Sequence, residues 1–288
     1  MNKRISEFRV DCHFGELAGI EYNALHEQQP SIIYIHGWLD NAASFQPIMD
    51  KIADLIPNAH QVAFDLAGHG LSSHKASDDF YSFHDYIDDL HQLLVNLSLK
   101  KCILVGHSLG GLITSCYSAA FPEHVVGLIQ IDGIGPLGES AENAVHRLRQ
   151  GIVSRERVRR KPRKGYASFE QALAHKAKTT KLNHDVVLPM VERGIEQRGN
   201  TWYWRADSRL SAQALYRMSV EQVVTYLQHI HCRFDIVAAQ HGLITQRNDL
   251  QRWRPSHAVV HHFPGGHHCH LENPTALAEL IQSQWQQL

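Results

Sequence analysis

Gly106-His107-Ser108-Leu109-Gly110 is the stretch that decides the fold, because of what stands on either side of it. The apolar run Lys101–Val105 comes directly before it and has the length and branched side chains of a buried strand. Leu112–Ala120 follows and is expected to form a helix that ends at Phe121-Pro122. Glycines on both sides of Ser108 indicate a sharp turn without room for side chains. The stretch therefore predicts a serine nucleophile exposed between a strand and a helix.

Further apolar runs resemble the expected strand before Ser108 in length and composition. They lie at Ser31–Ile35, Gln61–Asp65, Val125–Ile131, Phe234–Ala238 and Ala258–Phe263. Segments with helical spacing stand between them, most clearly Phe83–Leu97 and Pro274–Gln287. Strands that are apolar throughout and alternate with helices are typical of a parallel sheet covered on both faces. We therefore expect an α/β fold with a mostly parallel, twisted sheet.

The segment 137–218 differs in character from the rest of the chain. It is polar, rich in arginine and helical in pattern, and we expect no buried strand in it. We predict a core domain made of residues 1–136 and 219–288, with 137–218 inserted as a helical lid, or cap. The basic run 155–164 contains no aromatic residue, so we interpret it as a solvated face. Trp202-Tyr203-Trp204 is expected either to line a substrate pocket or to pack the cap.

Composition limits the classes of partner. The 288 residues are 43% apolar and 20% charged, with a net charge of -1, so no strong field attracts nucleic acid or an anionic membrane. The chain shows neither a secretory signal nor a membrane-spanning run, and we expect a cytoplasmic protein. Five scattered cysteines without a Cys-x-x-Cys pair indicate buried hydrophobic residues. A small-molecule substrate is the expected partner, and the oligomeric state is left open.

A serine hydroxyl needs a base to remove its proton. The glycine-rich loop Phe263–Pro274 supplies histidines after the last expected strand, where the order of strands places a base above Ser108. Zinc is the alternative use of this region, whose metal-binding side chains are His261, His262, His267, His268, Cys269 and His270. We do not favour zinc, because no Asp/Glu/His cluster elsewhere completes a site and the chain has 22 histidines. We expect neither metal nor cofactor, and we interpret His268 and His270 as ordinary loop and packing residues.

Two backbone amides are candidates for an oxyanion hole. The amide of Trp38 follows the first apolar strand in His36-Gly37-Trp38, although a plain turn explains that sequence as well. The amide of Leu109 stands at the start of the helix after Ser108, where the helix dipole also favours negative charge. Both would lie at the edge of the sheet where an oxyanion forms.

Four stretches together resemble the α/β-hydrolase superfamily and, within it, the serine hydrolase-like proteins. They are His36–Asn41, Phe64–Ser72, the stretch around Ser108, and His267–Pro274. The resemblance covers residues 10–135 and 220–288 and is weak across the cap. It implies that His267, which opens a His-x-x-His-Leu-Glu-x-Pro pattern, is the base. It also implies that Trp38, Ser108 and His267 meet at one end of the sheet.

The acid departs from the commoner pattern of that superfamily. Most relatives carry an aspartate in a Gly-x-x-Asp-Gly stretch, and here His241 holds that position within Ala238–Gly242. A histidine there cannot stabilise an imidazolium. Some branches place the acid after the preceding strand, which matches Asp132, and we prefer Asp132. Asp249, Asp235, no acid at all, and Asp132 as a mere cap are the alternatives.

The expected chemistry is acyl transfer from a small carboxylic ester to water. Ser108 attacks, His267 moves the proton, Asp132 orients His267, and the amides of Trp38 and Leu109 hold the oxyanion. A serine excludes haloalkane dehalogenases and epoxide hydrolases, which use a carboxylate nucleophile. Carbon–carbon bond hydrolases, cofactor-free haloperoxidases and a non-catalytic small-ligand-binding protein are the alternatives.

Overall fold

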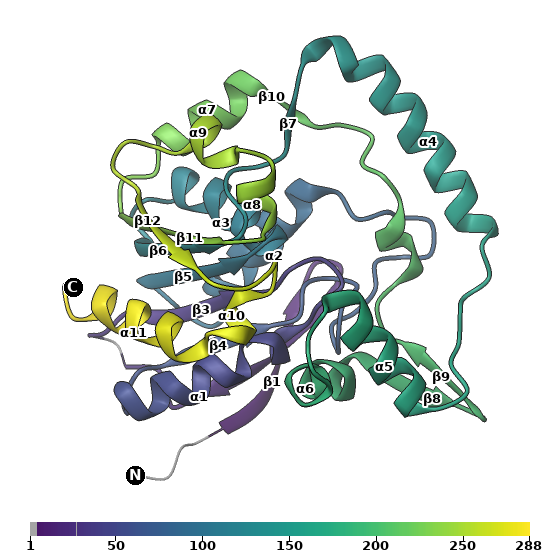
Figure 1. Ribbon diagram of the computed structural model, residues 1–288, viewed down its shortest axis with the longest axis horizontal. Coiled ribbons are helices and arrows are strands. Elements are labelled where there is room, and N and C mark those ends of the chain that lie inside the picture. Colours follow the sequence, from purple (N-terminus) through teal and green to yellow (C-terminus); the bar gives the residue numbers. More distant parts are fainter. Residues whose placement is uncertain (1–4, 27) are drawn as a thin grey trace.

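An eight-stranded sheet forms the centre of the computed structural model, which describes residues 5–26 and 28–288 (Figure 1). Its order is β1-β2-β4-β3-β5-β6-β11-β12; β2 runs antiparallel to both of its neighbours, β1 and β4, and the strands from β4 to β12 run parallel to one another. The strands are β1 Ile5–Cys12, β2 Gly15–Tyr22, β3 Ser31–Ile35, β4 Gln61–Phe64, β5 Cys102–His107, β6 Val125–Ile131, β11 Arg233–Ala239 and β12 Val259–Phe263. The predicted α/β fold with a mostly parallel sheet is confirmed. The hairpin β1–β2 was not predicted, because β1 is an edge strand whose side chains are mostly exposed.

Helices cover both faces of the sheet. Successive strand residues point to opposite faces, so Ile103 and Val105 in β5 face one apolar cluster and Leu104 faces the other. The first cluster packs under α1 (Gln46–Leu55) and α11 (Pro274–Trp285). The second packs under α2 (Phe83–Asn96), α3 (Leu109–Ala120) and α7 (Val220–Gln228). Short helices complete the core: α8 Leu243–Gln246, α9 Asp249–Trp253, α10 Cys269–Glu272 and the 3-10 turn Ala42–Phe45.

The helix after Ser108 begins earlier than the sequence indicates. It starts at Leu109, not at Leu112, and so includes Gly110 and Gly111. Glycine disfavours helix interiors, which is why the sequence suggested a longer turn. A Cβ at Gly110 would lie only 2.0 Å from the carbonyl oxygen of Ile35, so the helix can approach β3 this closely only with glycine there.

The segment 137–218, called the cap segment from here on, stands outside the sheet (Figure 1). Its two ends lie side by side, because β7 pairs with β10 in parallel. Its elements are β7 Gly138–Glu139, α4 Ala144–Arg160, α5 Phe169–Thr180, α6 His184–Gly194, β8 Ile195–Arg198, β9 Thr201–Trp204, β10 Met218–Ser219 and the 3-10 turns Ala141–Asn143 and Ser208–Ser211. The short strands were not expected. A role as a lid stays a prediction.

A buried ion pair joins the cap segment to the core. Nε of Arg193, in α6, donates to both carboxylate oxygens of Asp65 at 2.9 and 3.0 Å. The same carboxylate accepts the backbone amides of Ala42 and Leu71, each at 2.7 Å. Asp65 is fully buried, so Arg193 neutralises a charge that water cannot reach. The contact holds α6 against the loops that follow β3 and β4.

Aromatic residues of the cap segment pack within it. The rings of Trp202 and Phe169 meet edge to face at 5.6 Å, and Nε1 of Trp204 donates to the hydroxyl of Tyr166 at 3.2 Å. Packing is therefore the role that the structure gives Trp202 and Trp204. In the basic run 155–164, the six side chains of Arg157, Arg159, Arg160, Lys161, Arg163 and Lys164 are exposed. No helix within 5–26 and 28–288 combines the length and apolar character needed to cross a membrane.

Candidate active site

Ser108 lies on a strained turn between β5 and α3. Its φ is 50° and its ψ is -112°, a conformation that costs a residue with a side chain about 1–3 kcal/mol. The turn places Ser108 beyond the carboxyl end of β5, where it is only half-buried. Its backbone amide donates to the carbonyl of Ile131 at 2.9 Å, which ties the turn to the neighbouring strand β6. The structure therefore has the sharp strand-to-helix turn that the glycines predict.

Asp132 lies beside this turn, immediately after β6. Its carboxylate is fully buried and its φ is 45°. Backbone amides of Leu243 and Ile244 donate to its two oxygens at 2.7 and 3.2 Å. These amides belong to the first residues of α8, and they stabilise the ionised carboxylate. Asp132 is thus a buried, hydrogen-bonded carboxylate at the same edge of the sheet as Ser108.

His267 completes this arrangement from the loop after β12. Its Nδ1 atom lies 2.5 Å from Oδ2 of Asp132. A carboxylate accepts hydrogen bonds, so Nδ1 carries the proton and Nε2 of the neutral ring keeps a lone pair. The side chain of His267 is 29% exposed, whereas that of Asp132 is 0% exposed. The imidazole of His267 therefore reaches the solvent side of the site, and the carboxylate of Asp132 does not. The pair has the form required of a general base and its orienting acid.

Ser108 and His267 are neighbours without a direct hydrogen bond. His107, which precedes Ser108, donates from Nε2 to the carbonyl oxygen of His267 at 2.9 Å. The rings of His107 and His267 are 4.8 Å apart. Within the described residues Oγ of Ser108 has no hydrogen-bond partner, and such contacts often tighten only when substrate binds.

The alternative acids lie elsewhere. Asp235 is buried in β11, where it accepts from His261 and Gln284, each at 2.6 Å, and pairs with Arg233 at 3.0 Å. Asp249 is half-buried, and burial raises the pKa of its carboxyl. In the part of the chain that the structure describes, neither carboxylate contacts His267. Asp132 alone among the candidates does.

The loop around His241 supports the acid instead of supplying it. His241 is exposed, and the next residues, Gly242 to Ile244, wrap around the carboxylate of Asp132. A Cβ at Gly242 would lie 2.2 Å from Oδ1 of Asp132, so only glycine permits this approach. The loop in which the resemblance would place an aspartate therefore binds the aspartate of the neighbouring strand.

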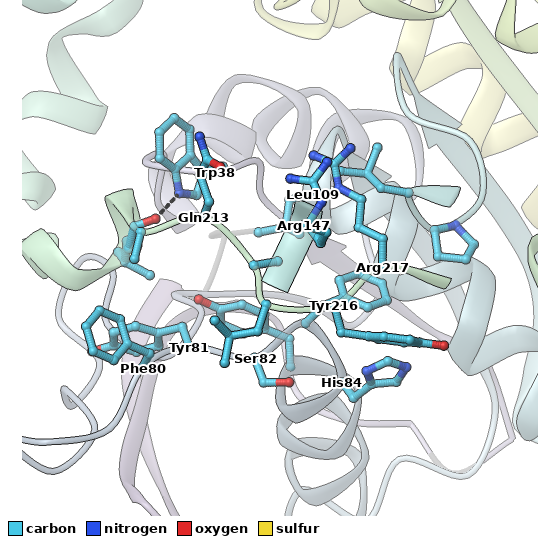
Figure 2. Close-up of a pocket in the computed structure, with 18 of the residues that line it drawn as sticks. Trp38, Phe80, Tyr81, Ser82, His84, Leu109, Arg147, Gln213, Tyr216 and Arg217 are labelled. Atoms are coloured by element: carbon cyan, nitrogen blue, oxygen red, sulfur yellow. Dashed lines mark hydrogen bonds between the residues drawn. The ribbon is translucent and has the colours of Figure 1, made fainter. Parts of the chain in front are cut away.

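Trp38 and Leu109, the residue that follows Ser108 in the chain, line a cavity of about 630 Å³ (Figure 2). Within the described residues neither backbone amide donates a hydrogen bond, so both are free to bind an oxyanion. The indole of Trp38 donates to the carbonyl of Leu210 at 3.1 Å and thereby connects the core to the cap segment. Buried His36 accepts the amide of Leu66 at 2.9 Å and contacts the carbonyl of Gly37 at 2.7 Å, which holds the loop of Trp38 in place.

Arginines reach this cavity from the cap segment. Figure 2 shows Arg147 and Arg217 beside Leu109, opposite the aromatic rings of Phe80 and Tyr81. Arg147 is paired with Glu139 through hydrogen bonds of 2.8 to 3.1 Å. Arg217 makes no salt bridge among the residues described, although the carboxylate of Glu139, which pairs with Arg147, lies near enough to attract it. Burial, together with nearby Arg147, lowers the pKa of the Arg217 guanidinium. The cavity thus presents a cation without a salt bridge next to the candidate oxyanion hole.

Sequence reasoning missed Arg217 and the role of Asp40. Asp40 is buried and accepts from Lys176 at 2.7 Å and from His268 at 3.2 Å. These partners lie 136 and 228 residues away along the chain, so no local pattern joins them. Arg217 stands alone in a polar segment without a motif.

Comparison with known proteins gives one family. The family model described as alpha/beta hydrolase fold matches residues 30–274. A serine hydrolase-like protein of Danio rerio is 26% identical, over 98% of this chain and 88% of its own. The 2-(acetamidomethylene)succinate hydrolase of Mesorhizobium japonicum is 35% identical over 103 residues, 36% of this chain and 35% of that protein. The crystal structure of a hypothetical protein from Pseudomonas aeruginosa PAO1 has a TM-score of 0.87 and 28% identity, covering 96% of this chain and 98% of that one.

Proposed function

We propose that this chain, which belongs to the α/β-hydrolase family, is a serine hydrolase that forms an acyl-enzyme on Ser108. The 2.5 Å contact between Nδ1 of His267 and Oδ2 of Asp132, at the sheet edge that carries Ser108, is the observation on which the proposal rests. A carboxylate at Nδ1 keeps the basic lone pair on Nε2 and stabilises the imidazolium that forms during the reaction.

The proposed reaction has two halves. Nε2 of His267 takes the hydroxyl proton of Ser108 while Oγ attacks the ester carbonyl carbon, and the amides of Trp38 and Leu109 hold the oxyanion. Collapse breaks the bond to the alcohol, which leaves with the proton from His267. Water then gives a proton to His267 and attacks the acyl carbon; the bond to Oγ breaks, His267 returns the proton to Oγ of Ser108, and the carboxylic acid is released. Each oxyanion donor contributes about 3 kcal/mol of transition-state stabilisation.

We further propose that the ester also carries a free acidic group. Arg217 supports this, because it is a partly buried cation without a salt bridge in the described chain and it lines the cavity next to Leu109 (Figure 2). A carboxylate bound there would offset the cost of burying the guanidinium. The substrate in the name of the Mesorhizobium japonicum relative is a succinate derivative, which is acidic in the same way.

The alternative of a non-catalytic ligand-binding protein is less well supported than the hydrolase. It depended on the missing aspartate at His241, and the carboxylate of Asp132 contacts His267 from another strand. A ligand-binding protein has no need of a carboxylate held against a histidine beside a strained serine.

Covalent labelling tests the proposal. We expect a fluorophosphonate probe to label wild-type protein once, on Ser108, and p-nitrophenyl acetate to give a burst of product. Ser108→Ala should lose both signals, whereas Ser256→Ala, which changes an exposed serine, should keep them. A wild-type protein that neither reacts with the probe nor turns over activated esters would refute the proposed function.

A further inference from the structure

Three metal-binding atoms lie close together near His267. They are Oδ2 of Asp40, Nδ1 of His107 and Nε2 of His268, and all lie within 4.8 Å of one another. Oδ2 of Asp40 is 3.7 Å from Nδ1 of His107 and 3.2 Å from Nε2 of His268. The three residues come from the loop after β3, the end of β5 and the loop before α10.

His107 contributes to the cluster a buried nitrogen without a partner among the described residues. Its ring is fully buried, and its Nε2 donates to the carbonyl of His267, which can only accept. Nδ1 of the neutral ring therefore carries a lone pair. Within the described residues this atom has no hydrogen-bond partner, and it points toward a carboxylate oxygen that also carries lone pairs. A cation between these two buried acceptors would satisfy both of them.

The separations match a small divalent ion. Zn²⁺ lies about 2.0–2.1 Å from imidazole nitrogen and carboxylate oxygen, and tetrahedral angles then separate the ligand atoms by roughly 3.3 Å. The two separations from Asp40, 3.2 and 3.7 Å, lie on either side of that value, and the third, between the two histidines, is at most 4.8 Å. Imidazole nitrogens favour zinc and other transition metals over Mg²⁺ and Ca²⁺, which prefer oxygen alone.

We propose that Asp40, His107 and His268 form a divalent transition-metal site, best suited to Zn²⁺, next to the catalytic base. Three protein ligands leave a fourth position for water. The hydrogen bond from His107 to the carbonyl of His267 fixes the ring that would hold the metal, as outer partners commonly do in metal sites. To bind the metal through Nε2, His268 gives up its hydrogen bond to Asp40 and carries its proton on Nδ1 instead.

Neighbouring groups set the strength of the site. Lys176 donates to Oδ1 of Asp40 at 2.7 Å, which leaves Oδ2 for the metal but places a positive charge nearby. The ring of His270 packs against that of His107 with centroids 4.2 Å apart and excludes water from that side. The side chain of His268 is 14% exposed, whereas those of Asp40 and His107 are at most 3% exposed, so His268 is the side from which an ion enters.

This proposal reverses an expectation from the sequence. Zinc was not favoured because no Asp/Glu/His cluster elsewhere in the chain completed a site with the histidines near the C-terminus. The fold brings Asp40 and His107 to His268 and supplies that cluster. The site does not depend on hydrolase activity, so its test uses metal binding as the readout.

Calorimetric titration of the metal-stripped full chain with ZnCl₂ tests the site. We expect one tight site per chain in wild type, and an affinity lower by more than about tenfold in His268→Gln and in Asp40→Asn. His262→Gln is the matched control, since it removes an exposed histidine of the neighbouring strand β12. That variant should bind as wild type does. Co²⁺ in place of Zn²⁺ should give visible absorption bands that His268→Gln abolishes.

Two results would overturn the proposal. One is wild-type protein without a stoichiometric zinc site. The other is His268→Gln with wild-type affinity, which would assign any binding to surface histidines. If Asp40→Asn does not fold, as circular dichroism would show, His268→Gln still decides, because its side chain lies at the rim of the cluster.

Discussion

Nδ1 of His267 lies 2.5 Å from Oδ2 of Asp132, although β11 separates the two strands that these residues follow. The loop after β11 crosses between them and donates the amides of Leu243 and Ile244 to the same carboxylate. The acid is therefore held by three hydrogen bonds from two loops. This arrangement makes the contact specific to Asp132, and it leads to predictions about which substitutions abolish activity.

Asp132→Asn should lower kcat by about 10,000-fold while the fold survives, because the amide favours the wrong tautomer of His267. Asp235→Asn is the control, since Asp235 is a buried carboxylate one strand away with its own partners. It should change kcat only a few-fold and lower the Tm. Steady-state kinetics with p-nitrophenyl acetate and thermal melts of both variants measure this. Equal losses of activity in the two variants would remove Asp132 from the mechanism.

Gly242→Ala should impair activity although it replaces no catalytic residue. The new methyl group would lie 2.2 Å from Oδ1 of Asp132 and must displace the carboxylate or the loop. We expect a loss of about 1–3 kcal/mol in the free energy of unfolding, as for other overpacked sites, and a lower kcat. Gly266→Ala serves as the control, because nothing lies within 4 Å of its built Cβ. Urea unfolding and kcat should both be close to wild type in that variant.

Arg217→Ala should change substrate preference and not the chemical step. For mono-p-nitrophenyl succinate, which carries a free carboxylate, kcat/KM should fall about 10- to 100-fold, since a charge-assisted hydrogen bond worth about 1.5–3 kcal/mol is lost. For p-nitrophenyl butyrate it should stay within a few-fold. Arg157→Ala removes an exposed arginine of α4 and should affect neither. A wild-type enzyme that hydrolyses both esters equally well would disprove the acidic substrate and leave the hydrolase proposal standing.

Stability should fall as the pH drops below 6.5. Burial lowers the pKa of His36 to about 4 and the pKa values of His69 and His270 to about 3. Because these folded-state values lie below the ordinary value of 6.5, the stabilisation is complete above pH 6.5 and is lost as the pH falls toward 4. Each histidine contributes up to about 1.4 kcal/mol per pH unit in that window. Urea unfolding at pH 7, 6 and 5 measures the slope, which His69→Phe should reduce.

Asp89 provides a control of opposite sign for the same experiment. Burial raises the pKa of its carboxyl to about 7, so its contribution to stability is lost as the pH rises from 3.8 to 7. Asp89→Asn should therefore stabilise the protein at pH 8 and have little effect at pH 4. A slope that neither His69→Phe nor Asp89→Asn alters would show that other groups control the pH dependence.

Much of the core could be predicted from short stretches of sequence. The runs that form β3, β4, β5, β6, β11 and β12 are apolar because both faces of the sheet are covered, and that composition is visible locally. β1 was missed because an exposed edge strand mixes charged and apolar residues. The start of α3 was misplaced because Gly110 and Gly111 suggest a turn, although here they serve close packing against β3. In each case the segment alone was not sufficient, because its structure depends on whether and how closely another element packs against it.

By itself, the sequence from Lys101 to Ala120 determined the sharp turn and Ser108 upon it, because glycine spacing and an apolar strand act through adjacent backbone, and the alternation of apolar runs with helical segments determined the parallel sheet. Tertiary structure alone decided which groups surround that serine. It brought Asp132 to His267 across 135 residues, and it gathered Asp40, His107 and His268 into one cluster. It also placed Arg217 in the cavity without a salt bridge among the described residues. Such contacts join loops at the ends of different strands, and only the order of strands in the folded sheet determines which loops meet.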